Sequence, residues 1–182
     1  MKKVITVTML LVGIMRFTGH AQEKYGNTLN LGLGIGYYGY TGSSAPVLSA
    51  NYEFDVFKNF TLAPFIMYYS FKKDYVYVDG NNRWRDDVYH DTFVPFGVKG
   101  TYYFDDLLGA SPKWDFYLGA SLGIQIKSSS IGIDNIHNDN YYNQASTLYL
   151  DFHIGTEYHL SSHIGIFLDL STGVSTVGLA IH

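Results

Sequence analysis

The sequence predicts an all-β fold, an eight-stranded antiparallel up-and-down transmembrane β-barrel, and three observations support this prediction. Residues 114–127 (WDFYLGASLGIQIK) alternate apolar with polar or small side chains at every position, as a strand does when its two faces have different surroundings. Seven further segments alternate in the same way, and mostly longer connections alternate with shorter ones. The composition is 17% aromatic, with 17 Tyr, 19 Gly and no Cys, which is typical of a β-barrel at a lipid–water interface.

The length of the 114–127 segment favours a membrane over a soluble sheet. Strands of soluble sheets usually have about five or six residues. At about 3.3 Å per residue and a tilt near 40°, twelve steps cover roughly 30 Å of height, which is the hydrocarbon thickness of a bilayer. A soluble ligand-binding barrel would carry polar side chains on its outer face, where this segment has Leu118, Leu122 and Ile124.

The first 21 residues are typical of a secretory signal peptide. Lys2 and Lys3 precede an apolar run over residues 4–15, and small residues lead up to a cleavage site after Ala21. A transmembrane helix would need about 20 apolar residues. We therefore expect a signal peptide over 1–21 and an outer-membrane β-barrel domain over 22–182.

The charge of the mature chain excludes several classes of partner. Without Lys2, Lys3 and Arg16, nine basic residues remain against 16 acidic ones, a formal charge of −7. Nucleic acid is therefore not an expected partner, and the absence of Cys excludes a disulfide scaffold. No sequence feature indicates a cofactor, and we expect a monomer.

The eight expected strands share the alternation but differ in how clearly they show it. Residues 27–37 set large apolar side chains opposite Asn and three Gly, which fits a narrow lumen. Residues 60–73 are the least regular, because both faces carry aromatics and because Pro64 removes a ladder hydrogen bond, so we expect a bulge or a local irregularity near Pro64. The expected strands are 27–37, 47–54, 60–73, 92–104, 114–127, 147–160, 164–171 and 176–182.

The connections define two sides of the barrel. Turns at 55–59, 105–113 and 161–163 share one side with both termini, and the connections 38–46, 74–91, 128–146 and 172–175 lie on the other. Short turns of outer-membrane barrels are periplasmic, so both termini are expected in the periplasm. Aromatic residues are expected at both interfaces, namely Tyr52, Phe54, Tyr102, Phe104, Trp114, Phe116 and Tyr158 on the turn side and Tyr37, Tyr68, Tyr69 and Tyr149 on the other.

The two long connections, 74–91 and 128–146, are candidate contact surfaces for a surface ligand or protein. Segment 74–91 is expected as a surface loop, or as a hairpin that extends the flanking strands beyond the membrane. Segment 134–140 (DNIHNDN) lacks the Gly and the distal Glu of a calcium loop, so we expect it to be solvated. Aromatic and basic residues give these loops the composition of a contact surface, and the alternative is a solvated loop without a partner. The residues are Tyr75, Tyr77, Arg83, Trp84, Arg85, Tyr89, Tyr141 and Tyr142.

The face opposite the apolar one is expected to fill the lumen. An eight-stranded barrel is only wide enough to be filled by side chains, and buried charges persist only when they are paired. We therefore expect a hydrogen-bonded core with an acid beside each lysine, and the alternative is a narrow polar pathway or a proton-sensitive gate. The lumen residues are Glu53, Lys99, Asp115, Gln125, Lys127, Asp151, His153, Glu157, His159 and Asp169, and the expected lipid-facing residues include Leu118, Leu122, Ile124, Leu150, Phe152 and Ile154.

Two histidines and two acids alternate on one face of the expected strand 147–160. His153 and His159, with Asp151 and Glu157, are spread over roughly 20 Å. Ligands that far apart on one strand cannot converge on one ion, so we expect no metal site.

The run FVPFGVKGTYYFDDLLGASPKWDFYLGASLGI, within residues 93–126, resembles small outer-membrane β-barrel proteins of the OmpA/OmpX-like superfamily, including proteins described as "porin family". The matching features are a Pro-x-Gly-x-Lys-Gly-x-Tyr-Tyr-Phe strand and a Tyr-x-Gly-x-x-x-Gly strand. The resemblance implies the outer membrane of a Gram-negative bacterium, contact with its lipids, and a structural or surface-interaction role without catalysis. The alternatives are a narrow porin-like channel for small solutes and a lipid-modifying outer-membrane enzyme.

One pair of residues matches the enzyme alternative in spacing. Outer-membrane lipid A deacylases resemble this barrel and use a His-x-Ser pair together with a Glu. His159 and Ser161 have this spacing, but the pair falls at an expected periplasmic turn, away from the outer leaflet. We therefore expect no catalytic residues here.

Overall fold

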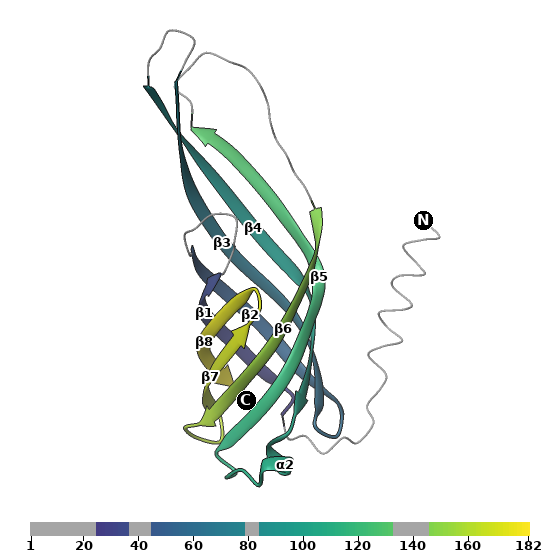
Figure 1. Ribbon diagram of the computed structural model, residues 1–182. Helices are drawn as coiled ribbons and strands as arrows, with labels where there is room; N and C mark the ends of the chain where they lie inside the picture. Colours follow the sequence, from purple (N-terminus) through teal and green to yellow (C-terminus); the bar gives the residue numbers. More distant parts are fainter. Residues whose placement is uncertain (1–24, 37–44, 79–83, 133–145) are drawn as a thin grey trace, which may run out of the picture.

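The protein is a closed barrel of eight antiparallel strands (Figure 1). A computed structural model describes residues 25–36, 45–78, 84–132 and 146–182, and describes the backbone alone for 71–78, 84–90, 129–132 and the single residues 45 and 146. Each strand pairs with the next along the chain, and β1 also pairs with β8. The predicted fold class is therefore confirmed. The strands are β1 (Thr28–Gly36), β2 (Ala45–Phe57), β3 (Phe60–Val78), β4 (Trp84–Tyr103), β5 (Trp114–Gly132), β6 (Ser146–His159), β7 (Ile164–Ser171) and β8 (Val174–Ile181).

Helical structure is confined to the connection between β4 and β5. In the described part of the chain, the only helix is the single turn α2 (Asp105–Leu108), which ends at Gly109 in the left-handed conformation, with φ of 59°. None of the described residues forms a helix of the length and apolar character needed to cross a membrane. We call the end of the barrel with α2, Lys58–Asn59 and residues 160–163 the turn end, and the opposite end the loop end.

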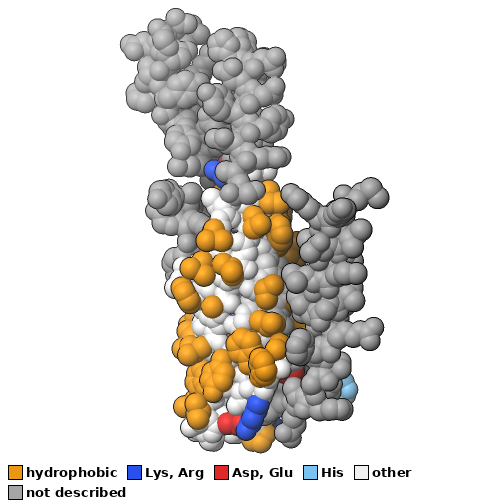
Figure 2. Space-filling model, turned by 90° about the vertical axis from the view of Figure 1, so that its right-hand side faces the viewer, with side chains coloured by type: hydrophobic (Ala, Val, Ile, Leu, Met, Phe, Trp, Pro, Cys, Tyr) orange, Lys and Arg blue, Asp and Glu red, His pale blue; other side chains and the backbone are white. Residues whose placement is uncertain are grey.

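The alternation in the sequence becomes the difference between the outside and the inside of the barrel. Large apolar side chains from all eight strands point outward, and Leu118 and Leu122 on β5 are 50% and 58% exposed. Figure 2 shows these side chains spread over the barrel wall, with charged side chains at its ends. The residues between them point inward and are buried, because successive side chains of a strand lie on opposite faces. An exposed apolar surface of this extent is typical of a protein that contacts lipid.

Three neighbouring strands extend well beyond the others at the loop end (Figure 1). β1, β7 and β8 have 8 or 9 residues, whereas β3, β4 and β5 have 19 or 20. A tilted strand crosses a bilayer with about 9–11 residues. β3 stays paired with β4 as far as Val78 and Trp84, and β4 with β5 as far as Val88 and Gly132. The long strands therefore form a three-stranded extension of the barrel.

This extension corrects part of the expected loop structure and supports the hairpin alternative. Most of segment 74–91 belongs to β3 and β4, and residues 128–132 belong to β5. Residues 74–78 and 84–91 do not alternate apolar with polar side chains, so the period-two contrast that identifies a strand is missing there even though Tyr and Val favour a strand. Tyr75, Tyr77, Trp84, Arg85 and Tyr89 lie on these strands with side chains outside the described part, whereas Arg83, Tyr141, Tyr142, segment 134–140 and the signal peptide lie outside the described residues altogether.

No bulge lies at Pro64, but the expected local irregularity does, because the β2–β3 ladder has no pairs between Asn51–Phe65 and Phe54–Leu62. Pro64 pairs with Val98 in a continuous β3–β4 register, and the β2–β3 pairs on either side of it keep one register. The register shifts instead between Asp55 and Phe57, next to the two-residue turn in which Asn59 has φ of 62°. A tight turn that closes on a bulge therefore takes up the extra residue, while Pro64 costs hydrogen bonds without changing the register.

The aromatic residues follow the expected interface at the turn end but not fully at the loop end. The ring centroid of Trp114 lies 4.8 Å from that of Tyr158 and 6.0 Å from that of Phe116, within an outward-facing cluster at the turn end. Tyr69 and Tyr149 are buried in the lumen, so their expected place at the outer interface was wrong. Both lie at inward positions of their strands, and the backbone alternation overrides the preference of Tyr for an interface.

Close contact between β4 and β5 predicts the effect of one substitution. Gly97 and Gly123 lie opposite each other, and a Cβ added to Gly123 would lie 2.1 Å from the backbone oxygen of Phe96. Gly123→Ala should therefore push the two strands apart and lower the free energy of unfolding by about 1–3 kcal/mol, measured by urea titration of the folded protein. Gly100→Ala is the matched control, because its Cβ would meet side chains and no backbone, namely the Phe60 ring at 3.2 Å and Leu62 Cδ2 at 3.6 Å. Equal stability of the two variants would contradict this packing.

Candidate functional site

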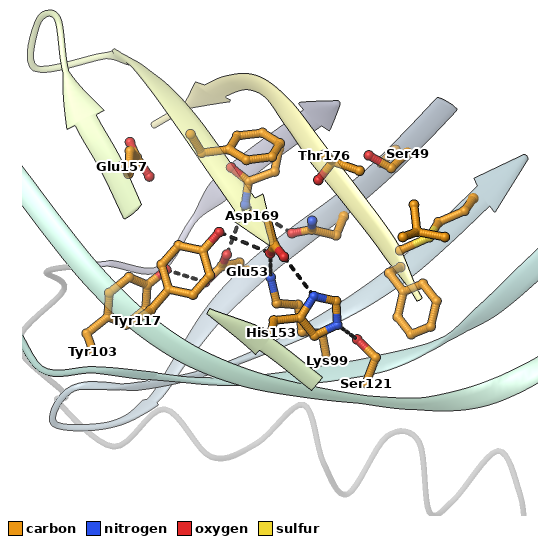
Figure 3. A pocket seen from close by; sticks show the side chains of 17 residues that line it. Ser49, Glu53, Lys99, Tyr103, Tyr117, Ser121, His153, Glu157, Asp169 and Thr176 are labelled. Carbon is orange, nitrogen blue, oxygen red and sulfur yellow. Dashed lines mark hydrogen bonds and ion pairs between the residues drawn. The ribbon is translucent and has the colours of Figure 1, made fainter. Parts of the chain in front are cut away.

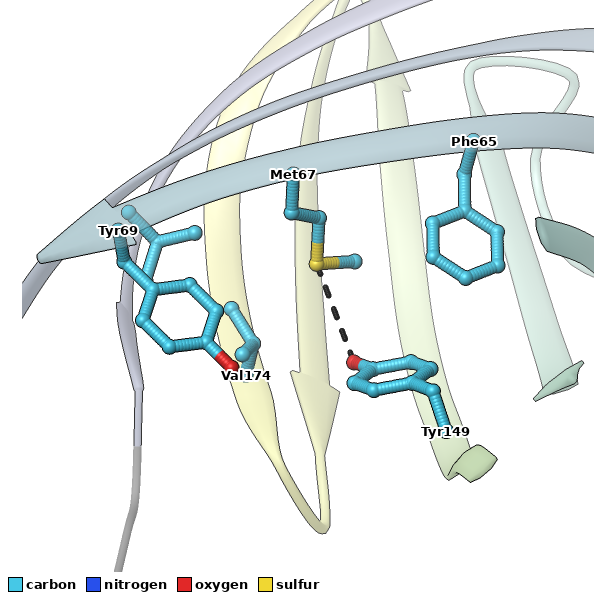
Figure 4. Close-up of a cluster of buried hydrophobic side chains, with 6 residues drawn as sticks. Phe65, Met67, Tyr69, Tyr149 and Val174 are labelled. Atoms are coloured by element: carbon cyan, nitrogen blue, oxygen red, sulfur yellow. Dashed lines mark hydrogen bonds between the residues drawn. The ribbon is translucent and has the colours of Figure 1, made fainter. Parts of the chain in front are cut away.

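The lumen is filled by three layers of side chains. At the loop end an apolar layer is formed by the buried side chains of Val47, Phe65, Met67, Tyr69, Tyr149 and Val174 (Figure 4). At the turn end Tyr25 stacks on Tyr103 with ring centroids 4.0 Å apart, and Tyr103 packs against Tyr117. Between these layers lies a network of charged and hydroxyl groups (Figure 3). The cavity inside this network has a volume of about 20 Å³, which is space for about one water molecule.

Glu53 on β2 is the first centre of this network. Its Oε1 accepts a hydrogen bond of 2.9 Å from Asn30 Nδ2, and its Oε2 accepts bonds of 2.6 Å from the Thr61 hydroxyl and 2.8 Å from the Tyr103 hydroxyl. The donors come from β1, β3 and β4. A buried carboxylate is stabilised when several donors surround it. Glu53 therefore links the four consecutive strands β1, β2, β3 and β4.

Asp169 on β7 is the second centre and connects to the opposite wall (Figure 3). Its Oδ2 forms an ion pair with the Lys99 ammonium and accepts a hydrogen bond of 3.0 Å from the Tyr117 hydroxyl. Its Oδ1 lies 2.8 Å from His153 Nδ1. Lys99 also lies over the Tyr117 ring, 4.8 Å from its centroid, a favourable cation–π contact. This centre joins β4, β5, β6 and β7.

Asp151 has a local role at the loop end. Although it is fully buried, its carboxylate accepts hydrogen bonds of 2.9 Å from the Ser171 hydroxyl, 2.7 Å from the Thr172 hydroxyl and 2.8 Å from the Gly173 backbone N–H. The tight connection between β7 and β8 thus wraps around one side chain of β6. The physical role of Asp151 is to satisfy donors that the turn would otherwise leave unpaired.

The remaining predicted lumen residues lie nearer the two ends. Gln125 accepts a hydrogen bond of 2.8 Å from the Tyr69 hydroxyl, and Lys127 Nζ lies 3.0 Å from Asp91 Oδ2. Each of the two lysines, Lys99 and Lys127, therefore has an acid beside it, as expected. Asp115, Glu157 and His159 gather at the turn end, where His159 Nε2 lies 2.7 Å from Asp115 Oδ2. The predicted lipid-facing residues all point outward and are exposed, namely Leu118, Leu122, Ile124, Leu150, Phe152 and Ile154.

One part of the network has the connectivity of a nucleophile–base–acid triad. Ser121 Oγ lies 2.8 Å from His153 Nε2, and His153 Nδ1 lies 2.8 Å from Asp169. Hydrolytic triads share this order of contacts. All three side chains are buried, however, and a cavity of about 20 Å³ cannot admit an acyl substrate. These contacts therefore serve to satisfy buried polar groups.

The His-x-Ser pair at the turn end is not assembled as a catalytic pair. Ser161 Oγ accepts hydrogen bonds of 3.2 Å from the backbone N–H groups of His163 and Ile164, which is the role of a turn-capping hydroxyl. His159 turns its Nε2 to Asp115 instead.

Several network residues were not among the predicted site residues. Asn30, Thr61, Tyr103, Tyr117 and Ser121 all bond to the charged centres. All five lie at inward positions of the alternation, so the period-two pattern places them in the lumen. Which acid each one reaches depends on strand neighbours, and that information is absent from a single strand.

The network predicts unequal costs for removing the two lysines. Lys99→Met leaves Asp169 without its cationic partner in a buried setting, and we expect a loss of about 3–5 kcal/mol in the free energy of unfolding. Lys127→Met is the matched control, because the Lys127 side chain is 34% exposed, and its pair with Asp91 should contribute about 1 kcal/mol or less. Urea unfolding followed by tryptophan fluorescence measures both. Similar losses in the two variants would contradict the central place of Lys99.

No family model and no curated protein matches the sequence. Among solved structures, the chain is similar to Neisserial surface protein A (NspA), with 14% identity and a TM-score of 0.55, over 85% of this chain and 94% of that one. It is also similar to Ail, the attachment invasion locus protein of Yersinia pestis (8% identity, TM-score 0.49, over 84% and 92%), and to the N-terminal β-barrel domain of Pseudomonas aeruginosa OprF (16%, 0.46, 86% and 96%). The chain therefore shares the barrel fold of NspA.

Proposed function

We propose that this chain is an integral outer-membrane protein whose barrel is a closed anchor and whose three-stranded extension makes contacts outside the cell. The observation that carries this proposal is an apolar outer wall around a filled lumen. The outer wall favours residence in a bilayer, since a soluble protein rarely exposes so much apolar surface. The secretory signal peptide expected over 1–21 supports the outer membrane as the destination.

The filled lumen favours an anchor over a channel. A conducting pore needs a continuous water path, and the apolar layer of six side chains described above spans the loop end of the lumen. Tyr25 and its stacking partner Tyr103 lie across the turn end. Without a path inside, contacts of the protein with other molecules must be made on its outer surface or at its ends.

The extension of β3, β4 and β5 is the part that we assign to surface contact. In outer-membrane barrels short turns face the periplasm and longer connections face the outside, which supports a periplasmic turn end with both termini. In this orientation the extension lies outside the cell. In the described part, the pairs of β3 with β2 end at Tyr69 and those of β5 with β6 end at Ile126, so the extension is a sheet with two edges, which suits recognition of another chain.

The assignment to a membrane is tested by a pair of leucine substitutions. Leu122→Arg places a charge on the outer wall near the middle of the β5 span and should lower the free energy of unfolding in lipid vesicles by about 2–4 kcal/mol. Leu107→Arg is the control, because Leu107 lies in the exposed turn α2 and should change stability by about 0.5 kcal/mol or less. Extraction of the wild-type protein from membranes by salt alone would refute the proposal.

The anchor role is tested by conductance. We expect the folded protein, identified by its heat-modifiable mobility on gels, to produce no steady current in a planar lipid bilayer. Tyr69→Ala/Tyr149→Ala, which removes the two largest side chains of the apolar layer, should remain silent as well, because the polar network and the Tyr25–Tyr103 stack still fill the lumen. A stable single-channel conductance of the wild-type protein would favour the channel alternative instead.

A further inference from the structure

Carboxylates greatly outnumber cations inside the barrel. Among the described residues, the buried charged side chains include six acids, Glu53, Asp105, Asp115, Asp151, Glu157 and Asp169, but one lysine, Lys99. Lys99 is already paired with Asp169 near the middle of the lumen. Asp115 and Glu157 at the turn end lie beside histidines instead. A second source of positive charge would therefore stabilise this end of the lumen.

Three metal-ligand side chains converge at the turn end. Glu157 and His159 lie two residues apart on the inner face of β6, and His182 follows β8. One ligand atom from each of the three residues lies within 4.8 Å of the others. Glu157 Oε1 is 3.7 Å from His159 Nδ1 and 2.8 Å from His182 Nε2. Metal–ligand bonds of about 2.0–2.2 Å at tetrahedral angles place ligand atoms about 3.3 Å apart, so these distances need only small adjustments.

Each imidazole is held by its other ring nitrogen. His159 Nε2 lies 2.7 Å from Asp115 Oδ2, and a carboxylate can only accept, so the proton is on Nε2 and Nδ1 keeps its lone pair. His182 Nδ1 lies 2.9 Å from the hydroxyl oxygen of Thr28, which donates its own hydrogen to the backbone oxygen of Tyr25. By the same argument Nε2 of His182 carries a proton in its 2.8 Å hydrogen bond with Glu157 Oε1, and a metal ion would replace this proton while Nδ1–H donates to Thr28. Such outer partners are typical of histidines that bind metals.

The fold leaves space for the three side chains to meet across β7. Gly165 lies opposite His159 on β6 and opposite Ala180 on β8. A Cβ on Gly165 would lie 2.0 Å from Glu157 Oε1, so the carboxylate occupies the volume that any other residue would fill. Glu157 thereby reaches past β7 toward His182. The hydrogen bond with Glu157 raises the pKa of His182 above its ordinary value, because a proton shared by these atoms is stabilised by the carboxylate.

We propose that Glu157, His159 and His182 bind one divalent transition-metal ion, with Zn²⁺ as the best fit, at the turn end of the lumen. Two imidazoles and one carboxylate are a ligand set that zinc uses in proteins when a fourth position is left for water. The nitrogen ligands select against Ca²⁺ and Mg²⁺, which prefer oxygen. The side chains of His159 and His182 are 22% and 19% exposed, so an ion enters from the solvent at this end. Once bound, it links β6 to β8 and, through Thr28, to β1.

Reasoning from one strand could not reach this site. Of the four alternating residues of β6, for which we expected no metal site, Glu157 and His159 belong to the proposed site, whereas His153 and Asp151 belong to other centres of the lumen. The third ligand, His182, is 23 residues further along the chain than His159 and meets it only because β8 lies two strands from β6 in the barrel.

The test is a zinc titration of the folded, untagged chain in detergent micelles by isothermal titration calorimetry. We expect one Zn²⁺ per wild-type chain. His182→Asn and His159→Asn, which each remove a ligand, should weaken binding at least 100-fold, and Asp115→Asn, which removes the partner of His159, should weaken it about 10–100-fold. The matched control is His163→Asn, since His163 is an exposed histidine of the same turn whose Nδ1 bonds to Ser162. This control should bind like the wild type.

Two further measurements accompany the titration, one of folding and one of the ligands. Each variant is first shown to have the heat-modifiable gel mobility of the wild type. The wild-type protein is then titrated with Co²⁺, whose visible absorption reports a nitrogen- and oxygen-ligated site of low coordination number. Undiminished Zn²⁺ binding by folded His182→Asn, loss of binding in His163→Asn, or the absence of a Co²⁺ spectrum would each overturn the proposal. Binding of Mg²⁺ or Ca²⁺ in preference to Zn²⁺ would also overturn it and would indicate an acidic cluster alone.

Discussion

The burial of Asp169 beside Lys99 is the interaction on which the interior of this barrel depends. Eight strands enclose a lumen only wide enough for side chains, and half of the side chains of every strand must enter it. Here they bring several carboxylates into a space almost free of water. The Lys99 ammonium compensates one of these charges at the centre, and the imidazole of His153 and the hydroxyl of Tyr117 supply the other donors.

The other acids are satisfied in different ways, and the differences divide the lumen by function. Glu53 and Asp151 have neutral donors on several strands, so each acts as a joint: Glu53 holds β1 to β4, and Asp151 holds the β7–β8 turn. Asp115 and Glu157 face histidines. A carboxylate beside an imidazole can share a proton with it or bind a metal ion together with it. At the turn end a bound ion can therefore replace this proton. At the centre Asp169 is instead paired with the Lys99 ammonium.

A rigid, filled barrel also determines where the rest of the sequence can act. Its lumen admits about one water molecule, and under the proposed function its apolar wall meets lipid while its long strands β3, β4 and β5 continue past the membrane. The barrel fixes the position of the extension, because β3, β4 and β5 keep one register from the barrel into the extension. Because the lumen has no room for a ligand, we assign contacts with other molecules to the ends of the barrel.

The sequence was informative wherever lipid lies on one side of the sheet. A bilayer imposes a period of two on strands that cross it, so strand number, the inward and outward faces and the position of Lys99, Asp151 and Glu157 were readable from 114–127 and its seven counterparts. The same signal is missing from residues 74–78 and 84–91, which is why they looked like a loop. Tyr69 was misplaced because its preference for an interface was weighed without the backbone alternation that turns its side chain inward.

By itself the sequence determined the class of fold, the two faces of each strand and the need for acids and lysines to pair inside. Only the tertiary structure decided which groups meet. Asp169 and Lys99, and likewise Glu157 and His182, are far apart in the sequence, and they meet because closure of the sheet sets a stagger between strands that no single strand encodes. Periodicity is a property of one strand and its two environments, whereas a contact across the lumen is a property of the closed barrel.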